Sequence, residues 1–373
     1  MQATRAIIHL DNLRKNIETA RKMIGPHPKI CLPVKADAYG HGSVPLSMFA
    51  LEAGVDYLAV SSALEGVELR SGGIKGPILV LSQTLPEELP LIAPLELTPF
   101  VSDAEFIDEA AHAAEDAKKQ LTVHLKVDTG MGRLGCRPDD AVSLAGKIVS
   151  KPWLKLGGVA THLSSSDSGE PDDIAYTKEQ LRIFNETIGV MKKAGIDPGL
   201  VHAANSGALV FHEDSYFDMV RPGLFLYGYS HARRGDHSTV PVMELQSAVV
   251  LIKQVKKGEA VSYGRTWTAP EDTCIGVIPA GYADGFPRGL SNNHSILIRG
   301  KAYPLAGRIC MDQCMVNLGP ETDVRRWDEA VIFGPGFITA ADMAEKLHGI
   351  PYEITCNINK RVLREYVRQQ AKM

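Results

Sequence analysis

The chain has 373 residues, of which 45% are hydrophobic and 23% charged, with a formal net charge of -4. This length exceeds that of one typical compact domain, so we expect one large domain or two moderate ones. The charge gives no basic footprint for nucleic acid, and no apolar run approaches the roughly 20 residues that span a bilayer.

The six cysteines are scattered along the chain, which argues against a disulfide scaffold and fits a reducing compartment. Cys310 and Cys314 have no second pair at zinc-ligand spacing, so we expect no metal site. The segment from Met1 to Leu10 lacks the apolar core of a signal peptide. These features together favour a cytoplasmic protein.

Short apolar runs alternate with helical patterns in the first two thirds of the chain. Eight runs have the composition of buried strands: Lys29–Lys35, Tyr57–Ser61, Ile78–Ser82, Thr98–Val101, Thr122–Asp128, Lys155–His162, Val201–Asn205 and Met219–Arg221. Apolar residues at helical spacing lie between them, as in Ser102–Gln120, Asp139–Val149 and Ala175–Ala194. This alternation predicts an α/β fold, a (β/α)8 barrel of the TIM type over residues 10–235. A doubly wound open sheet is the alternative, but the glycine-rich turn that usually follows its first strand is missing.

The composition changes after Tyr229, where Ser230–Thr239 is interpreted as a polar linker. Short β-like runs follow, separated by Gly, Pro and Asn: Met243–Gln254, Ala260–Ser262, Thr273–Pro279, Ser295–Ile298, Met315–Asn317 and Ala330–Phe333. Ala340–His348 is predicted to be a helix. We therefore expect a mainly β domain over residues 236–373, with residues 1–9 packed against it.

One lysine, Lys35, stands where an apolar run turns into a loop that carries glycine and histidine. Burial of an ammonium is costly unless the group is paired or neutralised. A lysine at the carboxyl end of a strand, beside Val34 and Tyr39, could be held partly neutral and form a Schiff base with a carbonyl. A surface lysine that ends a strand is the simpler interpretation of this segment alone.

Other polar residues also follow predicted strands, and the site of a β/α barrel lies at these carboxyl ends. They are Lys126, Asp128, Arg133, His162, Asn205, Ser206 and Arg221. Each has an ordinary interpretation by itself, as a core histidine, a helix cap or a surface cation. Together they predict a site on one rim. Backbone N–H groups at Ser206, Gly223 and Leu224 would bind an anion if they open helices, and a lysine beside a phosphate site indicates pyridoxal phosphate.

The chain resembles the bacterial alanine racemases, which are pyridoxal-phosphate enzymes with a barrel and a β domain. The resemblance runs from end to end and is carried by segments in the same order in both domains: Val34–Gly42, Lys126–Gly135, Gly158–His162, Asn205–Ser206, Arg221–Gly223, Val261–Gly264, Gly281–Gly285 and Gly307–Asp312. It implies a homodimer with shared active sites that interconverts L- and D-alanine and supplies D-alanine for peptidoglycan.

The resemblance also implies two bases on opposite faces of the substrate α-carbon. Lys35 would hold the cofactor and act on one face, and Tyr263 of the partner subunit would act on the other. Each enantiomer would then be deprotonated by one base and reprotonated by the other. His162, bonded to Arg221, would favour the phenolate of Tyr263, whose reference pKa near 10 makes it a poor base.

Further residues take roles only through the resemblance. The phosphate would be held by a set from the barrel rim: Tyr39, Ser206, Gly223 and Leu224. The substrate carboxylate would be held by a set from both subunits: Arg133, Met311 and Asp312. The opening of the site would be lined by Asp167, Tyr282 and Arg308. Lys126 matches a lysine that many members carry as a carbamate, and Arg221 would face the pyridine nitrogen.

Some alternatives stay open. Some family members carry a tyrosine that touches the phosphate where this chain has Asn359 or Lys360, so a broader racemase acting on serine and alanine is possible. Arg265 stands where smaller residues are common. A pyridoxal-phosphate decarboxylase of the same architecture would set a carboxylate against the pyridine nitrogen, and Arg221 argues against it. The sequence does not separate a biosynthetic from a catabolic role.

Overall fold

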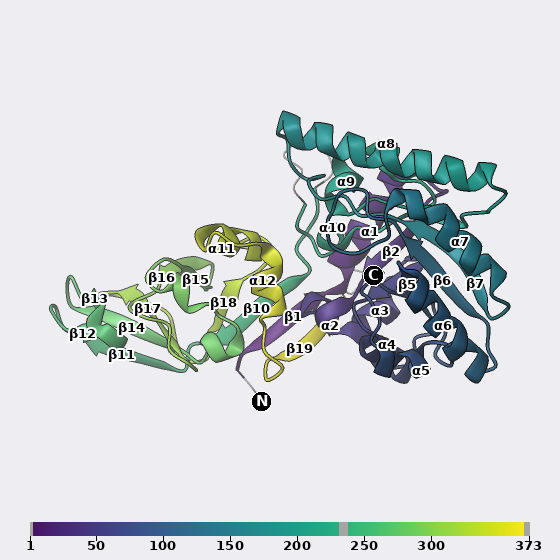
Figure 1. Cartoon of the computed structure of the whole chain (residues 1–373). Coiled ribbons are helices and arrows are strands. Elements are labelled where there is room, and N and C mark those ends of the chain that lie inside the picture. The colour runs from purple at the N-terminus through teal and green to yellow at the C-terminus, as the bar shows by residue number, and fades with distance from the viewer. Residues whose placement is uncertain (1–2, 231–237, 369–373) are drawn as a thin grey trace, which may run out of the picture.

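Eight parallel strands form one sheet in the barrel half of the computed structural model, which describes residues 3–230 and 238–368 (Figure 1). Their order is β8-β7-β6-β5-β4-β3-β2-β9. The strands are β2 (Lys29–Pro33), β3 (Tyr57–Val60), β4 (Ile78–Val80), β5 (Leu97–Val101), β6 (Leu121–Lys126), β7 (Leu154–Ala160), β8 (Leu200–His202) and β9 (Met219–Val220). The Asp218 N–H donates to the Val201 carbonyl at 3.0 Å, and the Arg221 N–H donates to the Ala204 carbonyl at 2.9 Å. These bonds join the two end strands, and the predicted barrel is confirmed.

Helices cover the outside of this sheet. They are α1 (Leu10–Ile24), α3 (Ser43–Glu52), α4 (Ala63–Ser71), α5 (Leu89–Ile92), α6 (Ala104–Asp116), α7 (Ala141–Ser150), α8 (Pro171–Lys193), α9 (Ser206–Phe211) and α10 (Gly223–Leu226). In α6, Asp103 caps the first turn by accepting from the Phe106 N–H at 2.8 Å. The buried residues Phe106, Ile107, Ala110 and Ala114 follow at helical spacing, so one face of α6 packs on the barrel.

The C-terminal half is built mainly from smaller β-sheets. A six-stranded sheet has the order β16-β15-β18-β10-β1-β19, beside a three-stranded sheet β11-β14-β17 and the pair β12-β13. The strands are β1 (Arg5–His9), β10 (Met243–Ala248), β11 (Leu251–Val255), β12 (Ala260–Val261), β13 (Trp267–Thr268), β14 (Thr273–Ile278), β15 (Ser295–Ile298), β16 (Lys301–Pro304), β17 (Cys314–Gly319), β18 (Glu329–Phe333) and β19 (Leu363–Val367). Two helices follow β18, namely α11 (Ala340–Lys346) and α12 (Pro351–Cys356). Thus β1, from the start of the chain, pairs with β10 and β19 of this half.

The structure differs from the sequence prediction at several boundaries. The run Met243–Gln254 is not one strand, because β10 lies in the six-stranded sheet and β11 in the three-stranded one. The strand predicted to end at Lys35 ends at Pro33. The predicted division between residues 235 and 236, and most of the predicted linker, lie outside the described residues. Within the described residues, no helix has the length and apolar character that crossing a membrane requires.

Candidate active site

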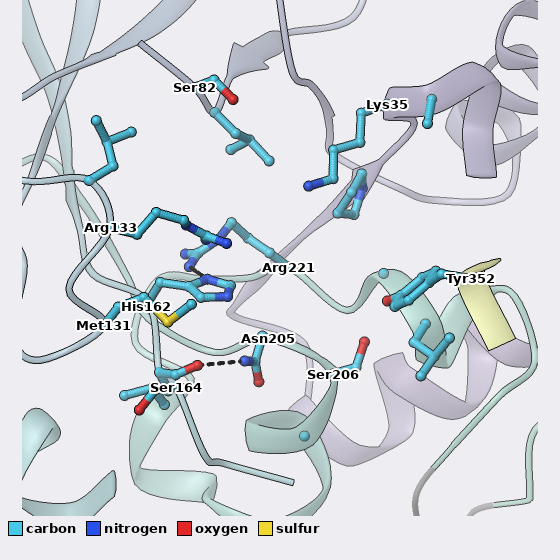
Figure 2. A pocket seen from close by; sticks show the side chains of 18 of the residues that line it. Lys35, Ser82, Met131, Arg133, His162, Ser164, Asn205, Ser206, Arg221 and Tyr352 are labelled. Atoms are coloured by element: carbon cyan, nitrogen blue, oxygen red, sulfur yellow. Dashed lines mark hydrogen bonds between the residues drawn. The ribbon is translucent and has the colours of Figure 1, made fainter. Parts of the chain in front are cut away.

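A cavity of about 750 Å³ lies at the carboxyl ends of the barrel strands (Figure 2). Many residues that the sequence placed on this rim line it: Lys35, Tyr39, Lys126, Arg133, His162, Asp167, Ser206, Arg221, Gly223 and Leu224. They follow β2, β6, β7, β8 and β9, which confirms that these strand ends meet at one place.

Lys35 is presented by an unusual turn. Residues 36–39, none of them glycine, have φ angles of 51° to 55°, the left-handed region. Each such residue costs about 1–2 kcal/mol, so the neighbours must hold the turn in place. The Asp37 carboxylate accepts from the Ser43 N–H at 2.7 Å, and the Glu65 carboxylate accepts from the Ala36 N–H at 2.8 Å. The turn brings Lys35 and Tyr39, four residues apart, to the same cavity.

The amine of Lys35 is partly dehydrated in this position. Burial lowers its pKa, and the positive charge of Arg133 lowers the pKa further, whereas Glu65 opposes the shift. A lower pKa raises the fraction of neutral amine, which is the form that attacks a carbonyl carbon. The Lys35 side chain points into the cavity in Figure 2.

Arg221 follows β9, the strand that pairs with β2 next to Lys35, and is 5% exposed. Its guanidinium donates to His202 Nδ1 at 2.7 Å, to the Thr161 carbonyl at 2.7 Å and to the Ala203 carbonyl at 3.1 Å. The same group lies 3.4 Å from His162 Nδ1, the contact dashed in Figure 2. Burial lowers the pKa of Arg221 to about 10, so this arginine stays charged at neutral pH.

Two buried histidines behind Arg221 were not singled out from the sequence. His202 Nε2 lies 2.9 Å from His124 Nδ1. Burial, with Arg221 nearby, lowers the pKa of His124 to about 3 and that of His202 well below its ordinary value. Both histidines are therefore neutral. A single histidine in an apolar strand carries no sequence signal that separates it from a core residue.

Hydroxyl and N–H groups converge at the other end of the cavity. Ser206 opens α9 after the cap Asn205, and the Ser206 hydroxyl accepts from the Phe225 N–H at 3.2 Å. The rings of Tyr39 and Tyr352 lie 4.6 Å apart. Burial raises the pKa of Tyr352, while the Leu224 N–H and the Tyr39 and Ser206 hydroxyls act to lower it, so these groups meet at its hydroxyl.

Gly223 leaves open the space between these hydroxyls. A Cβ atom at Gly223 would lie 3.1 Å from the Tyr39 hydroxyl and 3.3 Å from the Tyr352 hydroxyl. A side chain here would therefore intrude on the donors. The arrangement of several neutral donors around an open backbone is suited to a phosphate group.

Tyr352, in α12, also lines the cavity, although no pattern in the sequence singled it out. Asn359 and Lys360 are exposed, and neither lines the cavity. The Asn359 N–H donates to the Asp284 carbonyl at 3.2 Å, which holds this segment beside the C-terminal sheets. The expectation that Asn359 or Lys360 takes a place at the phosphate is wrong, and it gives no support to a broader substrate range.

Lys126 is buried at the base of the cavity, with 5% exposure. Its amine donates to the Val127 carbonyl at 3.2 Å. Burial, together with Arg221 and Arg133, lowers the pKa of Lys126 to about 7. A lysine in this state is half neutral near pH 7 and is available to react with an electrophile.

Asp128, predicted on the rim, does not line the cavity. Five residues to which the resemblance gave roles do not reach the cavity of their own chain either: Tyr263, Tyr282, Arg308, Met311 and Asp312. Tyr263 lies between β12 and β13, which Figure 1 places at the end of the C-terminal half away from the barrel. Its side chain is 70% exposed, and those of Tyr282 and Met311 are exposed as well. Large exposed side chains of this kind often mark a contact surface.

The backbone around Tyr263 is held in an uncommon conformation. Ser262 and Arg265 have φ angles of 70° and 47°. The Ser262 hydroxyl donates to the Arg308 carbonyl at 2.6 Å, and a Cβ atom at Gly264 would lie 3.1 Å from the Arg308 guanidinium. Tyr263 thus lies exposed in a turn that packs against Arg308, a residue that the resemblance places at the opening of the site.

Fold and site together define a barrel enzyme whose cavity pairs a dehydrated lysine with an anion-binding end. Family models described as "Alanine racemase, N-terminal domain" and "Alanine racemase, C-terminal domain" match residues 8–231 and 242–366. The chain belongs to the alanine racemase family.

Individual relatives agree with the family models along the whole chain. The alanine racemase of Treponema denticola is 48% identical over 98% of this chain and 99% of the relative. The alanine racemase of Treponema pallidum is 43% identical over 99% of this chain and 100% of the relative. The solved alanine racemase of Clostridium difficile 630 has a TM-score of 0.94 at 35% identity, covering 99% and 97%. The alanine racemase of Bacillus anthracis with bound L-Ala-P has a TM-score of 0.90 at 33% identity, covering 99% and 96%.

Proposed function

We propose that this chain interconverts L- and D-alanine with pyridoxal phosphate and supplies D-alanine for peptidoglycan. The observation that carries the proposal is the meeting of Lys35, with its lowered pKa, and the anion-binding end of the same cavity. The relatives named alanine racemase support the substrate and the reaction.

The residues of the cavity fit pyridoxal phosphate. Lys35 offers an amine for the aldehyde, and the hydroxyls of Tyr39 and Ser206 with the Leu224 N–H offer donors for the phosphate. The open backbone at Gly223 leaves room between them. When bound, the cofactor supplies stabilisation of negative charge at the substrate α-carbon.

Arg221 would donate a hydrogen bond to the pyridine nitrogen and keep its own proton. An arginine donates but does not accept, and its pKa of about 10 keeps it charged at the working pH. Arg221 therefore does not transfer its proton to the ring nitrogen. This arrangement limits misplaced protonation of the substrate and argues against a decarboxylase, which would use a carboxylate here.

Two bases then exchange the proton on opposite faces. Lys35 would remove or return the α-proton on one face, and Tyr263 of the partner subunit would do so on the other. Within one chain Tyr263 is 70% exposed and does not line the cavity, so a second copy has to bring it. We therefore propose a homodimer with shared sites. Arg221, 3.4 Å from His162 Nδ1, would favour the Tyr263 phenolate through His162.

The substrate carboxylate would meet groups from both subunits. Arg133 lines the cavity of its own chain, and Met311 and Asp312 would come from the partner. Asp167 would lie at the opening on the barrel side, with Tyr282 and Arg308 of the partner opposite it. Because these positive and polar groups converge from two chains, the binding site is complete only in the dimer.

We also propose that Lys126 is carbamylated. Its pKa of about 7 leaves much of the amine neutral. The neutral nitrogen forms a bond to carbon dioxide and releases one proton, which gives a carbamate anion. Arg221 and Arg133, which both lower the pKa of Lys126, are the cations that would stabilise the anion.

Mixing two inactive variants tests the shared site. Lys35→Ala and Tyr263→Phe should each lose racemisation as separate homodimers. A mixed dimer keeps one intact site if Tyr263 acts across the interface, so random mixing of subunits should restore about one-quarter of wild-type activity. No recovery, with mixing verified by mass, would contradict the shared site. Loss of the cofactor absorbance band in Lys35→Ala tests the assignment of that lysine separately.

A further inference from the structure

We propose that Arg364 and Tyr366, on the C-terminal strand β19, are positioning residues that hold the left-handed turn and thereby place Lys35 and Tyr39 for the cofactor. Neither side chain lines the cavity. The inference deepens the proposed function and rests on it for the identity of the cofactor.

The turn satisfies part of its own backbone. The Gly42 N–H donates to the Asp37 carbonyl at 2.9 Å, and the His41 N–H donates to the Ala38 carbonyl at 3.1 Å. The His41 ring Nδ1 lies 2.9 Å from the Ala38 carbonyl and 3.0 Å from the Tyr39 carbonyl. These bonds use the carbonyls of residues 37–39, and the next two carbonyls point toward β19.

Residues of β19 bind those two carbonyls. Arg364 Nε donates to the Gly40 carbonyl at 3.1 Å, and the Tyr366 hydroxyl donates to the His41 carbonyl at 3.0 Å. Figure 1 places β19 beside this turn, labelled α2 (Lys35–Tyr39). Parallel pairing with β1 fixes β19 in turn. The end of the chain is thereby attached to the segment that carries the lysine.

The packing leaves no room for adjustment at this contact. A Cβ atom at Gly42 would lie 1.8 Å from the Tyr366 hydroxyl, and one at Gly40 would lie 2.0 Å from the Thr355 carbonyl oxygen. Left-handed backbone persists only where the surroundings determine it from several sides. The turn is held by its own hydrogen bonds on one side. On the other side it is held by β19 and α12, which belong to the C-terminal half.

The remaining N–H groups of Arg364 bind the segment that precedes β19. They donate to the carbonyls of Asn359 and Val362, both at 2.7 Å, and of Ile358 at 2.6 Å. The rigid, planar guanidinium of Arg364 therefore binds this segment and the left-handed turn at the same time. An arginine suits this role because its N–H groups have a fixed arrangement.

Arg364→Met tests the proposal, with Arg70→Met as the matched control. Arg70 likewise donates to four backbone carbonyls, those of Leu95, Ile74, Gly76 and Glu96, but none of them belongs to the left-handed turn. Amide hydrogen exchange of residues 36–42 is measured in the cofactor-free protein. The dissociation constant of pyridoxal phosphate is measured by absorbance titration.

We expect Arg364→Met to accelerate amide hydrogen exchange in residues 36–42. It should also raise the dissociation constant of pyridoxal phosphate about tenfold, which corresponds to the loss of one charge-assisted hydrogen bond. Tyr366→Phe, which keeps the ring and loses only the hydroxyl, should change both in the same direction. It serves as the second variant if Arg364→Met does not fold. Arg70→Met should leave both quantities unchanged.

The proposal is overturned if amide hydrogen exchange of residues 36–42 is unchanged in both Arg364→Met and Tyr366→Phe. It is also overturned if Arg70→Met loses as much affinity for pyridoxal phosphate as Arg364→Met does. Since exchange is measured without cofactor, it distinguishes the two proposals. A wild-type protein that fails to bind pyridoxal phosphate contradicts the proposed function, while faster exchange in the β19 variants still supports the hold on the turn.

Discussion

Arg221 donates to Nδ1 of His202 over 2.7 Å, and this bond determines where the proton of His202 lies. An arginine has no acceptor, so His202 Nδ1 carries a lone pair and Nε2 carries the hydrogen. His202 Nε2 in turn lies 2.9 Å from His124 Nδ1, which must accept. The two histidines thus form a chain of hydrogen bonds with one direction, leading from the buried cation into the barrel.

The first prediction concerns these tautomers. Both histidines should be neutral with hydrogen on Nε2, and neither should titrate between pH 5 and 9, because burial lowers the pKa of His124 to about 3 and that of His202 well below its ordinary value. Long-range 15N spectra of the imidazoles measure this directly. The unfolded chain takes up these protons below about pH 6.5, so stability should fall as the pH decreases from there. Hydrogen on Nδ1, or a titration near pH 6.5, would contradict the inferred chain.

A second prediction distinguishes Tyr352 from Lys360. Tyr352→Phe removes a hydroxyl at the anion-binding end. It should weaken the binding of pyridoxal phosphate about tenfold, which corresponds to about one hydrogen bond. Binding of pyridoxal, which has no phosphate, should be unchanged. Lys360→Ala is the control, since Lys360 is exposed and does not line the cavity. Titrations monitored by absorbance would count against this assignment if Lys360→Ala had the larger effect.

Third, Lys126 should influence how stability depends on pH in protein freed of carbon dioxide and cofactor. Its pKa is about 7 in the folded protein, against an ordinary value of 10.5, so between these pH values the unfolded chain binds up to one more proton than the folded protein. The free energy of unfolding should rise with pH over this range by up to about 1.4 kcal/mol per pH unit from this group. Urea unfolding of Lys126→Met should lack that contribution. Lys22→Met, at an exposed site, should keep the wild-type slope.

A fourth prediction concerns the two glycines at turns near the start of the chain. Gly25 has φ 75° and ψ -171°, a conformation essentially restricted to glycine, and nothing lies near its Cβ position. Gly25→Ala should therefore lower the free energy of unfolding by about 1–3 kcal/mol through its backbone alone. Gly40 has a φ of 83°, and its Cβ atom would lie 2.0 Å from the Thr355 carbonyl oxygen. Gly40→Ala should therefore lower the free energy of unfolding by at least about 2 kcal/mol more than Gly25→Ala does. Equal losses in denaturant unfolding would show that the contact with α12 relaxes freely.

Local patterns were enough for the barrel and for one half of the site. Buried apolar runs such as Ile78–Ser82 are visible in any short window, and the carboxyl ends of parallel strands must meet at one rim. For that reason Lys35, Arg221 and Ser206 could be placed together from their positions after strands, and the structure brings all three to one cavity.

Other features depend on contacts between distant parts of the chain. The left-handed turn after Val34 has no glycine until Gly40, so no local signal predicts it, and its partners Arg364 and Tyr366 stand at the other end of the sequence. Tyr352 reaches the cavity because α12 packs beside Tyr39, which periodicity does not reveal.

By itself, then, the sequence determined the order of strands and the residues that follow them, because these rest on propensity and burial over a few neighbouring residues. The tertiary structure decided which backbone conformation presents Lys35, which tyrosine approaches the anion-binding end, and that Tyr263 lies exposed away from the cavity of its own chain. These outcomes are set by long-range packing and hydrogen bonds, whose energies no local window of sequence contains.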